Sequence, residues 1–208
     1  MPKHVILVLN YQGESQKSKQ DIVTEAKAIE TKLKAKGYEV KLHEKQLDFQ
    51  IWMNDNALSK GLTKIHIVAH GNQAQCGNYN GASLADYIQR YIKGKRELSA
   101  ITIHSCMSAS VHPGTGQIFV EQFAARLLTH LKGNHSQYIV VRGSDGESYT
   151  DSTGRNWVLK DGVEIPKYNS RERELVFLNN QTQDRGTARP QYAIHASSGE
   201  GYRSVDRM

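Results

Sequence analysis

Apolar and polar stretches alternate along this chain in the order expected of strands separated by helices. The continuous apolar run 5–9 is typical of a strand buried on both faces. A helix follows, because apolar residues recur every three or four positions: Ile22, Ala26, Ile29 and Leu33. Asp21 is a good N-cap for that helix and Gly37 a good stop. With the alternating residues 38–42 as a second strand, the opening is a β-α-β unit with a right-handed crossover and parallel pairing.

The same alternation continues as far as residue 142. Three further β-branched, apolar runs predict buried strands: 63–69, 100–105 and 138–142. Helices are predicted between them: a short one within 49–62, one opening at Ser83 with Asp86 completing a capping box, and an amphipathic one over 117–132. The sequence therefore predicts an α/β domain whose central sheet is mostly parallel and flanked by helices.

The pattern changes beyond residue 142. Short β-like runs at 147–150, 156–159 and 163–165 are separated by turns rich in Asp, Gly and Ser, which predicts a hairpin or flap. We expect residues 1–165 to form one domain, with the flap at about 143–165. Residues 166–208 are predicted to be a C-terminal extension packed on the same domain, with strand candidates at 175–178 and 192–194.

Composition narrows the partners of the domain. No window approaches 18 continuous apolar residues, so no membrane span is expected, and the first apolar run is too short for a signal peptide. The two cysteines do not make a disulfide framework, which favours a reducing environment at the moment of action. A net charge of +6 favours an anionic partner. We expect no nucleic acid, because the chain lacks interleaved aromatic and basic residues and any recognisable nucleic-acid-binding module.

Two strand ends carry the candidate chemistry. One apolar run leads to His70-Gly71 and another to Cys106. Catalytic groups in open α/β sheets gather at the carboxyl ends of strands, so neighbouring strands would bring an imidazole and a thiol together. That pair suits a cysteine–histidine hydrolase, with the N–H groups of Gly71 and Cys106 as oxyanion donors. A lone cysteine is usually a buried hydrophobe and a lone histidine a satisfied surface group, but the joint pattern favours catalysis.

Other residues that could carry chemistry fit less well. His66 and His70 are roughly 13 Å apart along an extended strand, too far to bind one metal, so no metal site is expected. His104 is a rival base, although its place inside an apolar run favours a core position. Cys76 follows His70 in a polar loop and is predicted to be exposed and incidental.

The constellation resembles a known family. The match is carried by the His-Gly and Cys blocks, by residues 80–88 and 117–131, and by the runs 140–145 and 151–158. These are similar to the autoprocessing cysteine peptidase domains of large bacterial toxins, the RTX type and the large clostridial type, within the caspase-like clan. The resemblance covers roughly residues 3–165. It implies a caspase-like three-layer sandwich closed by a β-flap.

The resemblance also implies a function. Members are activated by inositol hexakisphosphate, which binds a basic pocket across the flap from the catalytic dyad, and they cleave their own polypeptide after leucine. This implies an enzyme with no cofactor for its chemistry, secreted or injected by a bacterium and active in the host cell cytosol. The substrate would be its own polypeptide or a host protein, and we expect a monomer.

Carried over to this chain, Cys106 is the nucleophile and His70 its base. An acidic residue before the first helix falls on Asp21, for which the N-cap interpretation is equally good. Arg142, Arg155 and, more weakly, Lys160 match the phosphate pocket. The chain departs from the family at Ser105, where glycine is usual. The alternative hypothesis is a non-catalytic caspase-like module that holds a polyphosphate or a protein partner on its basic surface.

Overall fold

A seven-stranded sheet forms the centre of the protein. The computed structural model describes residues 3–10, 12–55, 61–92, 97–131, 139–166, 172–177 and 192–197. The strands of the sheet lie in the order β10-β9-β5-β4-β3-β1-β2. The five from β5 to β2 are parallel, whereas β9 pairs antiparallel with β5 and with β10. The predicted α/β class with a mostly parallel sheet is therefore confirmed, and it is consistent with a caspase-like sandwich.

The elements of the sheet match the predicted apolar runs. Its strands are β1 (Lys3–Val8), β2 (Glu39–His43), β3 (Leu62–Val68), β4 (Ala100–His104), β5 (Val140–Gly143), β9 (Glu172–Phe177) and β10 (Tyr192–Ser197). The helices are α1 (Gln16–Ala35), α2 (Gln46–Asn54), α3 (Gly81–Ile92) and α4 (Phe119–Leu131). Since β9 and β10 extend the central sheet, the described residues after 166 lie on the same body as the rest. Within the described ranges, no helix has the length and apolar character needed to cross a membrane.

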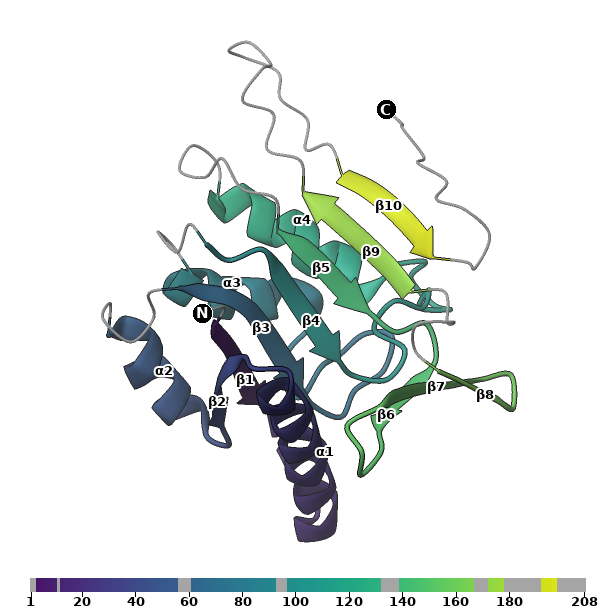
Figure 1. Cartoon of the computed structure of the whole chain (residues 1–208). Helices are drawn as coiled ribbons and strands as arrows, with labels where there is room; N and C mark the ends of the chain where they lie inside the picture. The colour runs from purple at the N-terminus through teal and green to yellow at the C-terminus, as the bar shows by residue number, and fades with distance from the viewer. Residues whose placement is uncertain are drawn as a thin grey trace, which may run out of the picture.

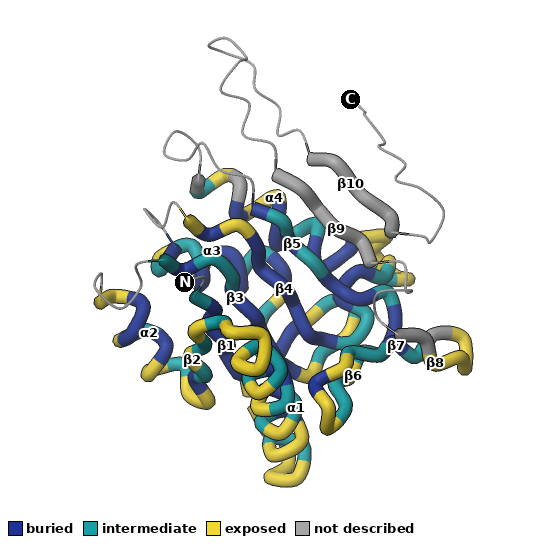
Figure 2. The backbone as a smooth tube through the Cα atoms, in the orientation of Figure 1, coloured by how far each residue is buried: buried dark blue, intermediate teal, exposed yellow. Residues whose placement is uncertain are grey.

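Helices cover the sheet on two sides. Helix α1 lies in front of the sheet in Figure 1, while α3 and α4 lie behind it. Alternate residues of each buried strand serve the two sides, because side chains along a strand point to opposite faces. Val5 and Leu7 pack with α2, α3 and α4, whereas Ile6 and Val8 pack with α1. Figure 2 shows β1, β3 and β4 as the deeply buried middle of these layers.

A second, antiparallel sheet forms the predicted flap. It consists of β6 (Glu147–Thr150), β7 (Asn156–Lys160) and β8 (Val163–Pro166), in that order. The turn before β7 docks on α1: a Cβ built on Gly154 would lie 2.7 Å from the carbonyl oxygen of Ala28 and 2.7 Å from Cβ of Lys32. Gly154 also has φ of +75°, so the turn needs glycine for both its conformation and its close approach.

The capping residues predicted for α1 and α3 were wrong. Helix α1 begins at Gln16, and Ser15 caps it by accepting a hydrogen bond of 3.1 Å from the amide of Ser18; Asp21 lies inside the helix and is exposed. The first turn is entirely polar, so it gave no apolar period to detect. Helix α3 begins at Gly81, two residues before the predicted start at Ser83. The side chain of Asn80 caps it by accepting a hydrogen bond of 2.8 Å from the amide of Ser83.

Candidate active site

His70 and Cys106 emerge at the same edge of the central sheet. Strands β3 and β4 are adjacent and parallel, and Val68 pairs with His104 in register. His70 and Cys106 each follow that matched pair by two residues, so both lie just beyond the carboxyl ends of neighbouring strands, and their pairing as a catalytic dyad stays a prediction. The His70 side chain is 49% exposed, and Cys106 is partly buried.

A glutamate that the sequence analysis missed contacts His70. The Oε1 atom of Glu14 lies 3.5 Å from Nε2 of His70, and the Glu14 side chain is only 4% exposed. The hydroxyl of Ser18 donates a 2.7 Å hydrogen bond to the same oxygen of Glu14. The carboxylate is therefore held in place by the first turn of α1. Asp21, the predicted acidic residue, is exposed on the next turn of the helix, and its role at the site stays a prediction.

Gly71 is required by packing as well as by its place beside His70. A Cβ at this position would lie 2.2 Å from the carbonyl oxygen of Gln75 and 2.2 Å from Oγ of Ser105. The loop after His70 folds back at once, since the amide of Gly77 donates to the His70 carbonyl at 2.8 Å. Ser105 is buried against this turn. The residue before the nucleophile, where the family usually has glycine, thus fills space beside Gly71.

The Cys106 thiol has a raised pKa and is hydrogen-bonded to the flap. Its Sγ donates to the carbonyl oxygen of Ser148 in β6 at 3.7 Å. Burial raises the pKa of the Cys106 thiol above its ordinary value, and the nearby carboxylates of Glu147 and Glu25 raise it further. Glu25 on α1 also accepts a 2.8 Å hydrogen bond from the Thr150 hydroxyl. Cys106, the predicted nucleophile, therefore lies where the sheet, α1 and the flap meet.

The loop after Cys106 is tied to the segment that leads into the flap. Met107 has φ of +55°, a left-handed conformation that is uncommon for a residue with a side chain. Its amide donates to the carbonyl of Gly146 at 2.7 Å, and the amide of Ala109 donates to that of Ser144 at 2.8 Å. A movement of the flap base would thus reach the nucleophile loop directly. The predicted oxyanion donors, the N–H groups of Gly71 and Cys106, flank this loop and stay a prediction.

Basic side chains gather on the α1 side of the sheet, and we call them the cationic cluster: Lys32, Lys36, Lys64, Arg142 and Arg155. Burial lowers the pKa of Lys64, and the charges of Arg142 and Lys36 lower it further. Burial also lowers the pKa of Lys32, and the positive charges of Lys36 and Arg155 lower it further. The negative charge of Asp151 acts in the opposite direction. Charges lower one another's pKa values in this way only when they lie close together. The five cations therefore share one region between α1, the sheet and the flap.

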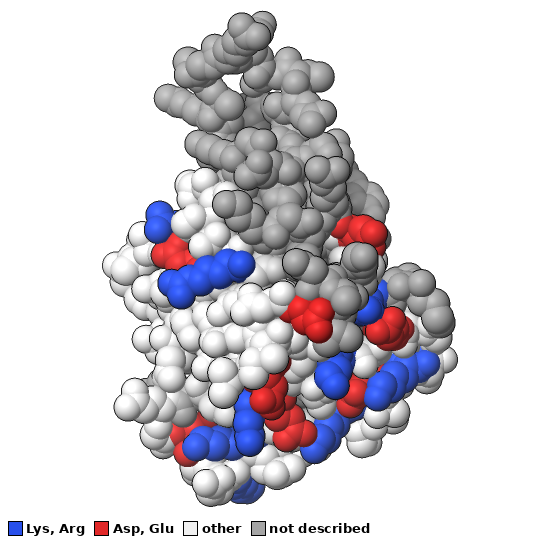
Figure 3. Space-filling model, turned by 90° about the vertical axis from the view of Figure 1, so that its left-hand side faces the viewer, with Lys and Arg blue, Asp and Glu red and all other residues white. Residues whose placement is uncertain are grey.

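The cluster includes two of the three predicted phosphate ligands. Arg142 lies on β5, and Arg155 on the flap stacks over the ring of Trp157 at 4.7 Å. Lys160 ends β7, but its side chain lies outside the described structure. The lysines at 32, 36 and 64 were missed because single lysines at polar positions are indistinguishable from solvated ones in a sequence. On the face drawn in Figure 3, by contrast, acidic and basic side chains lie interspersed.

A comparison with protein families matches residues 3–158 to the Peptidase C80 family. The chain belongs to that family. It is therefore a cysteine peptidase, a hydrolase that acts on a polypeptide, of the autoprocessing type found in secreted bacterial toxins. The matched region runs from β1 into β7 and includes both strand ends described above. This decides between the two hypotheses in favour of the enzyme. A search of curated proteins finds no match for the chain.

The second cysteine of the peptidase belongs to its core. Cys76 is fully buried among apolar side chains behind the sheet, so the prediction that it is exposed was wrong. Burial raises the pKa of its thiol to about 12, which keeps it protonated and unreactive. In the loop that holds Cys76, this residue forms isolated antiparallel β-bridges with both Gly71 and Tyr79. The polar residues around Cys76 in the sequence gave no sign of this pairing. His104 is buried, as its place in an apolar run predicted.

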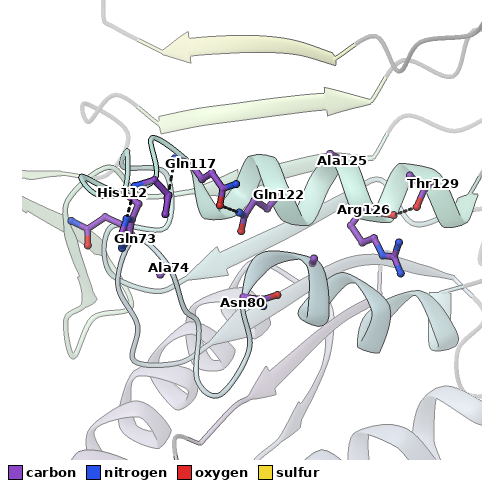
Figure 4. A pocket seen from close by; sticks show the side chains of 11 residues that line it. Gln73, Ala74, Asn80, His112, Gln117, Gln122, Ala125, Arg126 and Thr129 are labelled. Carbon is purple, nitrogen blue, oxygen red and sulfur yellow. Dashed lines mark hydrogen bonds between the residues drawn. The ribbon is translucent and has the colours of Figure 1, made fainter.

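Two pockets of the C80 peptidase adjoin the catalytic loops. One, of about 470 Å³, lies beside His70 and is lined by Glu14, Ser18 and the loop from Gly71 to Gly77. The other, of about 530 Å³, lies between the loops that follow His70 and Cys106 and the helices α3 and α4. Figure 4 shows the amide side chains that line it, with Gln117 bonded to Gln122 and Arg126 at the far end. The first pocket touches the proposed base and is the better candidate for a substrate residue.

Proposed function

We propose that this C80 peptidase cleaves its substrate with Cys106 as nucleophile and His70 as general base, and that Glu14 orients His70. The observation that carries the proposal is the register of β3 and β4, which delivers both residues two positions beyond the Val68–His104 pair. A carboxylate held against imidazole Nε2 leaves Nδ1 to serve the thiol, as in other nucleophile–base–acid arrangements.

The reaction follows from these roles. His70 removes the proton of Cys106, and the thiolate attacks the scissile carbonyl carbon to form a C–S bond. The tetrahedral oxyanion is stabilised by the N–H groups of Gly71 and Cys106. The C–N bond then breaks while His70 returns its proton to the leaving amine, which gives an acyl-thioester. Water, deprotonated by the same imidazole, hydrolyses the thioester and restores the thiol.

We also propose that a polyphosphate, inositol hexakisphosphate in the resemblance that the sequence carries, activates the enzyme from the cationic cluster. The pKa of the Cys106 thiol is raised, which favours the thiol over the reactive thiolate, so Cys106 is a poor nucleophile in this arrangement. A ligand with many phosphates would bridge Lys64 and Arg142 to Arg155 on the flap. Because the flap base is bonded to the loop after Cys106, repositioning it would reset the nucleophile. This is a population shift, and it requires tighter binding to the active arrangement.

For the substrate, we propose cleavage of the enzyme's own polypeptide after leucine, in the host cell cytosol. Support comes from the family, whose members are autoprocessing domains of toxins. The leucine preference and the host location rest on the resemblance of the motifs.

Labelling with a thiol-reactive activity probe tests the proposal. We expect the wild type to be labelled only when inositol hexakisphosphate is added, Cys106→Ala to remain unlabelled, and Cys76→Ala to behave like the wild type. Equal labelling of wild type and Cys106→Ala would remove Cys106 from the mechanism. A ligand-induced rise in melting temperature that survives the double change Arg142→Ala and Arg155→Ala would remove the proposed pocket. Equal labelling with and without the ligand would remove only the activation.

A further inference from the structure

Three buried histidines form a continuous hydrogen-bonded chain across the α1 side of the sheet. Nδ1 of His4 lies 3.1 Å from Nε2 of His66, and Nδ1 of His66 lies 3.1 Å from Nε2 of His104. The rings are stacked, with centroids 5.3 Å and 5.4 Å apart. Their exposed fractions are 2%, 8% and 6%. The peptidase chemistry described above uses none of them.

The chain runs diagonally from the cationic cluster towards the nucleophile. His4 on β1 is the registered partner of Lys64 on β3, and both face α1. His66 stands two residues further along β3, and His104 ends β4 as the partner of Val68. Cys106 follows His104 by two residues, so their Cα atoms are at most roughly 7 Å apart. One end of the chain therefore borders the cluster and the other end approaches the thiol.

The hydrogen-bond pattern limits how many protons the chain can hold. Three neutral imidazoles satisfy both internal hydrogen bonds, with all N–H groups pointing in one direction. One added proton can be accommodated on His66, which then donates from Nε2 to His4 and from Nδ1 to His104. A second added proton would place two N–H groups against each other. The chain therefore accommodates two states, neutral and singly protonated, which differ by one proton; on His66 that proton provides a donor to each neighbouring ring.

Nearby charges decide between these states. Among the described residues, the other charged or titratable groups on this side are Lys64 on β3, Arg142 on β5, Lys32, Lys36 and Glu25 on α1, Asp151 and Arg155 before β7, and Cys106 with Glu147 near the far end. Tyr38 stacks on His4, with ring centroids 4.6 Å apart. The neighbouring residues of β1 and β2 that face α1 are apolar: Ile6, Val8, Val40 and Leu42. Burial of the His4 ring and, after it, the positive charge of Lys64 lower the pKa of His4 and favour its neutral form. An anion bound to the cluster would offset the second of these effects.

We propose that binding of a polyphosphate to the cationic cluster is accompanied by uptake of one solvent proton into the His4–His66–His104 chain. The proton comes from the buffer and resides on His66 as an imidazolium. The imidazolium donates to His104, which precedes Cys106 by two residues, and its positive charge stabilises the thiolate against Glu25 and Glu147. The inference rests on the proposed activation by a polyphosphate, and it adds a proton as the second component of that switch.

Calorimetric titration of the full chain with inositol hexakisphosphate tests this. Titrations at pH 6.5 in buffers of different ionisation enthalpy give the number of protons taken up, and comparison with His66→Gln cancels protons that belong to the ligand. We expect the wild type to take up about half to one proton more than His66→Gln, so its affinity should rise up to about tenfold more per pH unit of acidification. His43→Gln is the matched control, because His43 is also buried but lies on the other side of the sheet; it should behave like the wild type.

The outcomes separate this inference from the function on which it rests. Equal proton uptake by wild type and His66→Gln, with both binding the ligand, would overturn the histidine chain as the acceptor and leave the activation standing. No binding by the wild type would overturn both the ligand and the linked proton. If His66→Gln does not fold, ¹⁵N NMR of the wild-type histidines decides. Saturation with ligand should move both ring nitrogens of His66 to protonated shifts, and unchanged shifts would overturn the proposal.

Discussion

The two sides of the central sheet are built from different chemistry. Behind the sheet, α2, α3 and α4 enclose a large cluster that is apolar throughout, from Phe49 to Val141. In front of it, α1 covers a much smaller apolar cluster of six buried residues, which are Ile6, Val8, Ile22, Ala26, Ile29 and Val68. The remaining area in front carries the three-histidine chain, Lys64 and Arg142. The same strands thus contribute apolar residues to one side and polar residues to the other.

The two sides of the sheet therefore have different roles: the rear contributes mainly to stability and the front mainly to function. Burial of apolar side chains is the main favourable term in folding, so the rear side contributes most of it. Buried polar groups and cations cost free energy unless they are paired, and the front side holds several of them close together. Both proposed catalytic residues and the flap adjoin this costly side. We therefore expect changes behind the sheet to act on stability and changes in front of it to act on catalysis and its control.

The two cysteines give the largest contrast. Cys106→Ala should lower peptidase activity by about 10⁴-fold or more, because no other group forms the acyl intermediate. Its effect on the free energy of unfolding should be small, since Cys106 is only partly buried in a loop. Cys76→Ala should keep its activity and lose about 1–2 kcal/mol of unfolding free energy through a small cavity. Peptide cleavage assays and urea unfolding measure both quantities. Activity in Cys106→Ala, or its loss in a folded Cys76→Ala, would break the contrast.

Phe123 and Lys64 test the same division with one side chain from each side, the first fully buried and the second partly buried. Phe123→Ala removes a fully buried ring from α4 and should lower the unfolding free energy by about 3–5 kcal/mol. Lys64→Met keeps the aliphatic volume and removes a cation that its neighbours repel, so stability should be unchanged or slightly higher.

The two variants should differ in the opposite way towards the ligand. Lys64→Met should lose most of the rise in melting temperature caused by inositol hexakisphosphate, whereas Phe123→Ala should keep it at a lower starting temperature. Urea unfolding and thermal melts with and without the ligand are the measurements. A strongly destabilised Lys64→Met would show that the cluster is part of the folding core.

Acidification should destabilise both sides through buried histidines. Burial lowers the pKa of His4 and of His43 from 6.5 to about 4, with Lys64 and Lys41 as the next causes. Between these values the unfolded chain takes up a proton and the folded protein does not. The unfolding free energy should therefore fall as the pH drops from 6.5 to 4, by up to about 3 kcal/mol per histidine.

Variants locate the two contributions. His4→Gln and His43→Gln should each reduce the slope of unfolding free energy against pH by a similar amount. Ligand binding should weaken the contribution of His4, in front of the sheet, and leave that of His43 unchanged. Denaturant unfolding at closely spaced pH values measures the slopes, and a pH-independent stability in the wild type would contradict the prediction.

The sheet could be predicted from the sequence, and the catalytic pair could be hypothesised from it, because both depend on local pattern. Apolar β-branched runs identify buried strands, and parallel strands place their carboxyl ends at one edge, so His70 and Cys106 follow without knowledge of the register. Glu14 could not be identified in this way. It precedes a helix start whose first turn has no apolar residue, and 56 residues separate it from His70.

The histidine chain and the core position of Cys76 depend on contacts that no local pattern encodes. His66 and His104 appeared as isolated residues within apolar runs, and His4 lay at the start of the first run. Only the register of β1 with β3 and of β3 with β4 shows that the three rings meet. Cys76 is surrounded by polar residues in the sequence, yet the loop folds inward because Gly71 allows a close turn against Ser105.

Glu14→Gln should give the smallest effect, a decrease of about tenfold in kcat with KM unchanged, because the carboxylate acts through His70 and not on the substrate. Glutamine keeps the hydrogen bond from Ser18, so the fold should be unaffected. Glu30→Gln is the matched control, since Glu30 lies on α1, the helix that begins two residues after Glu14, but pairs with Lys34 at 2.8 Å. Steady-state cleavage by these variants and by Asp21→Asn decides which acid serves the histidine. Wild-type activity in Glu14→Gln together with a loss in Asp21→Asn would return the role to Asp21, and would mean that the contact seen at Nε2 orients nothing.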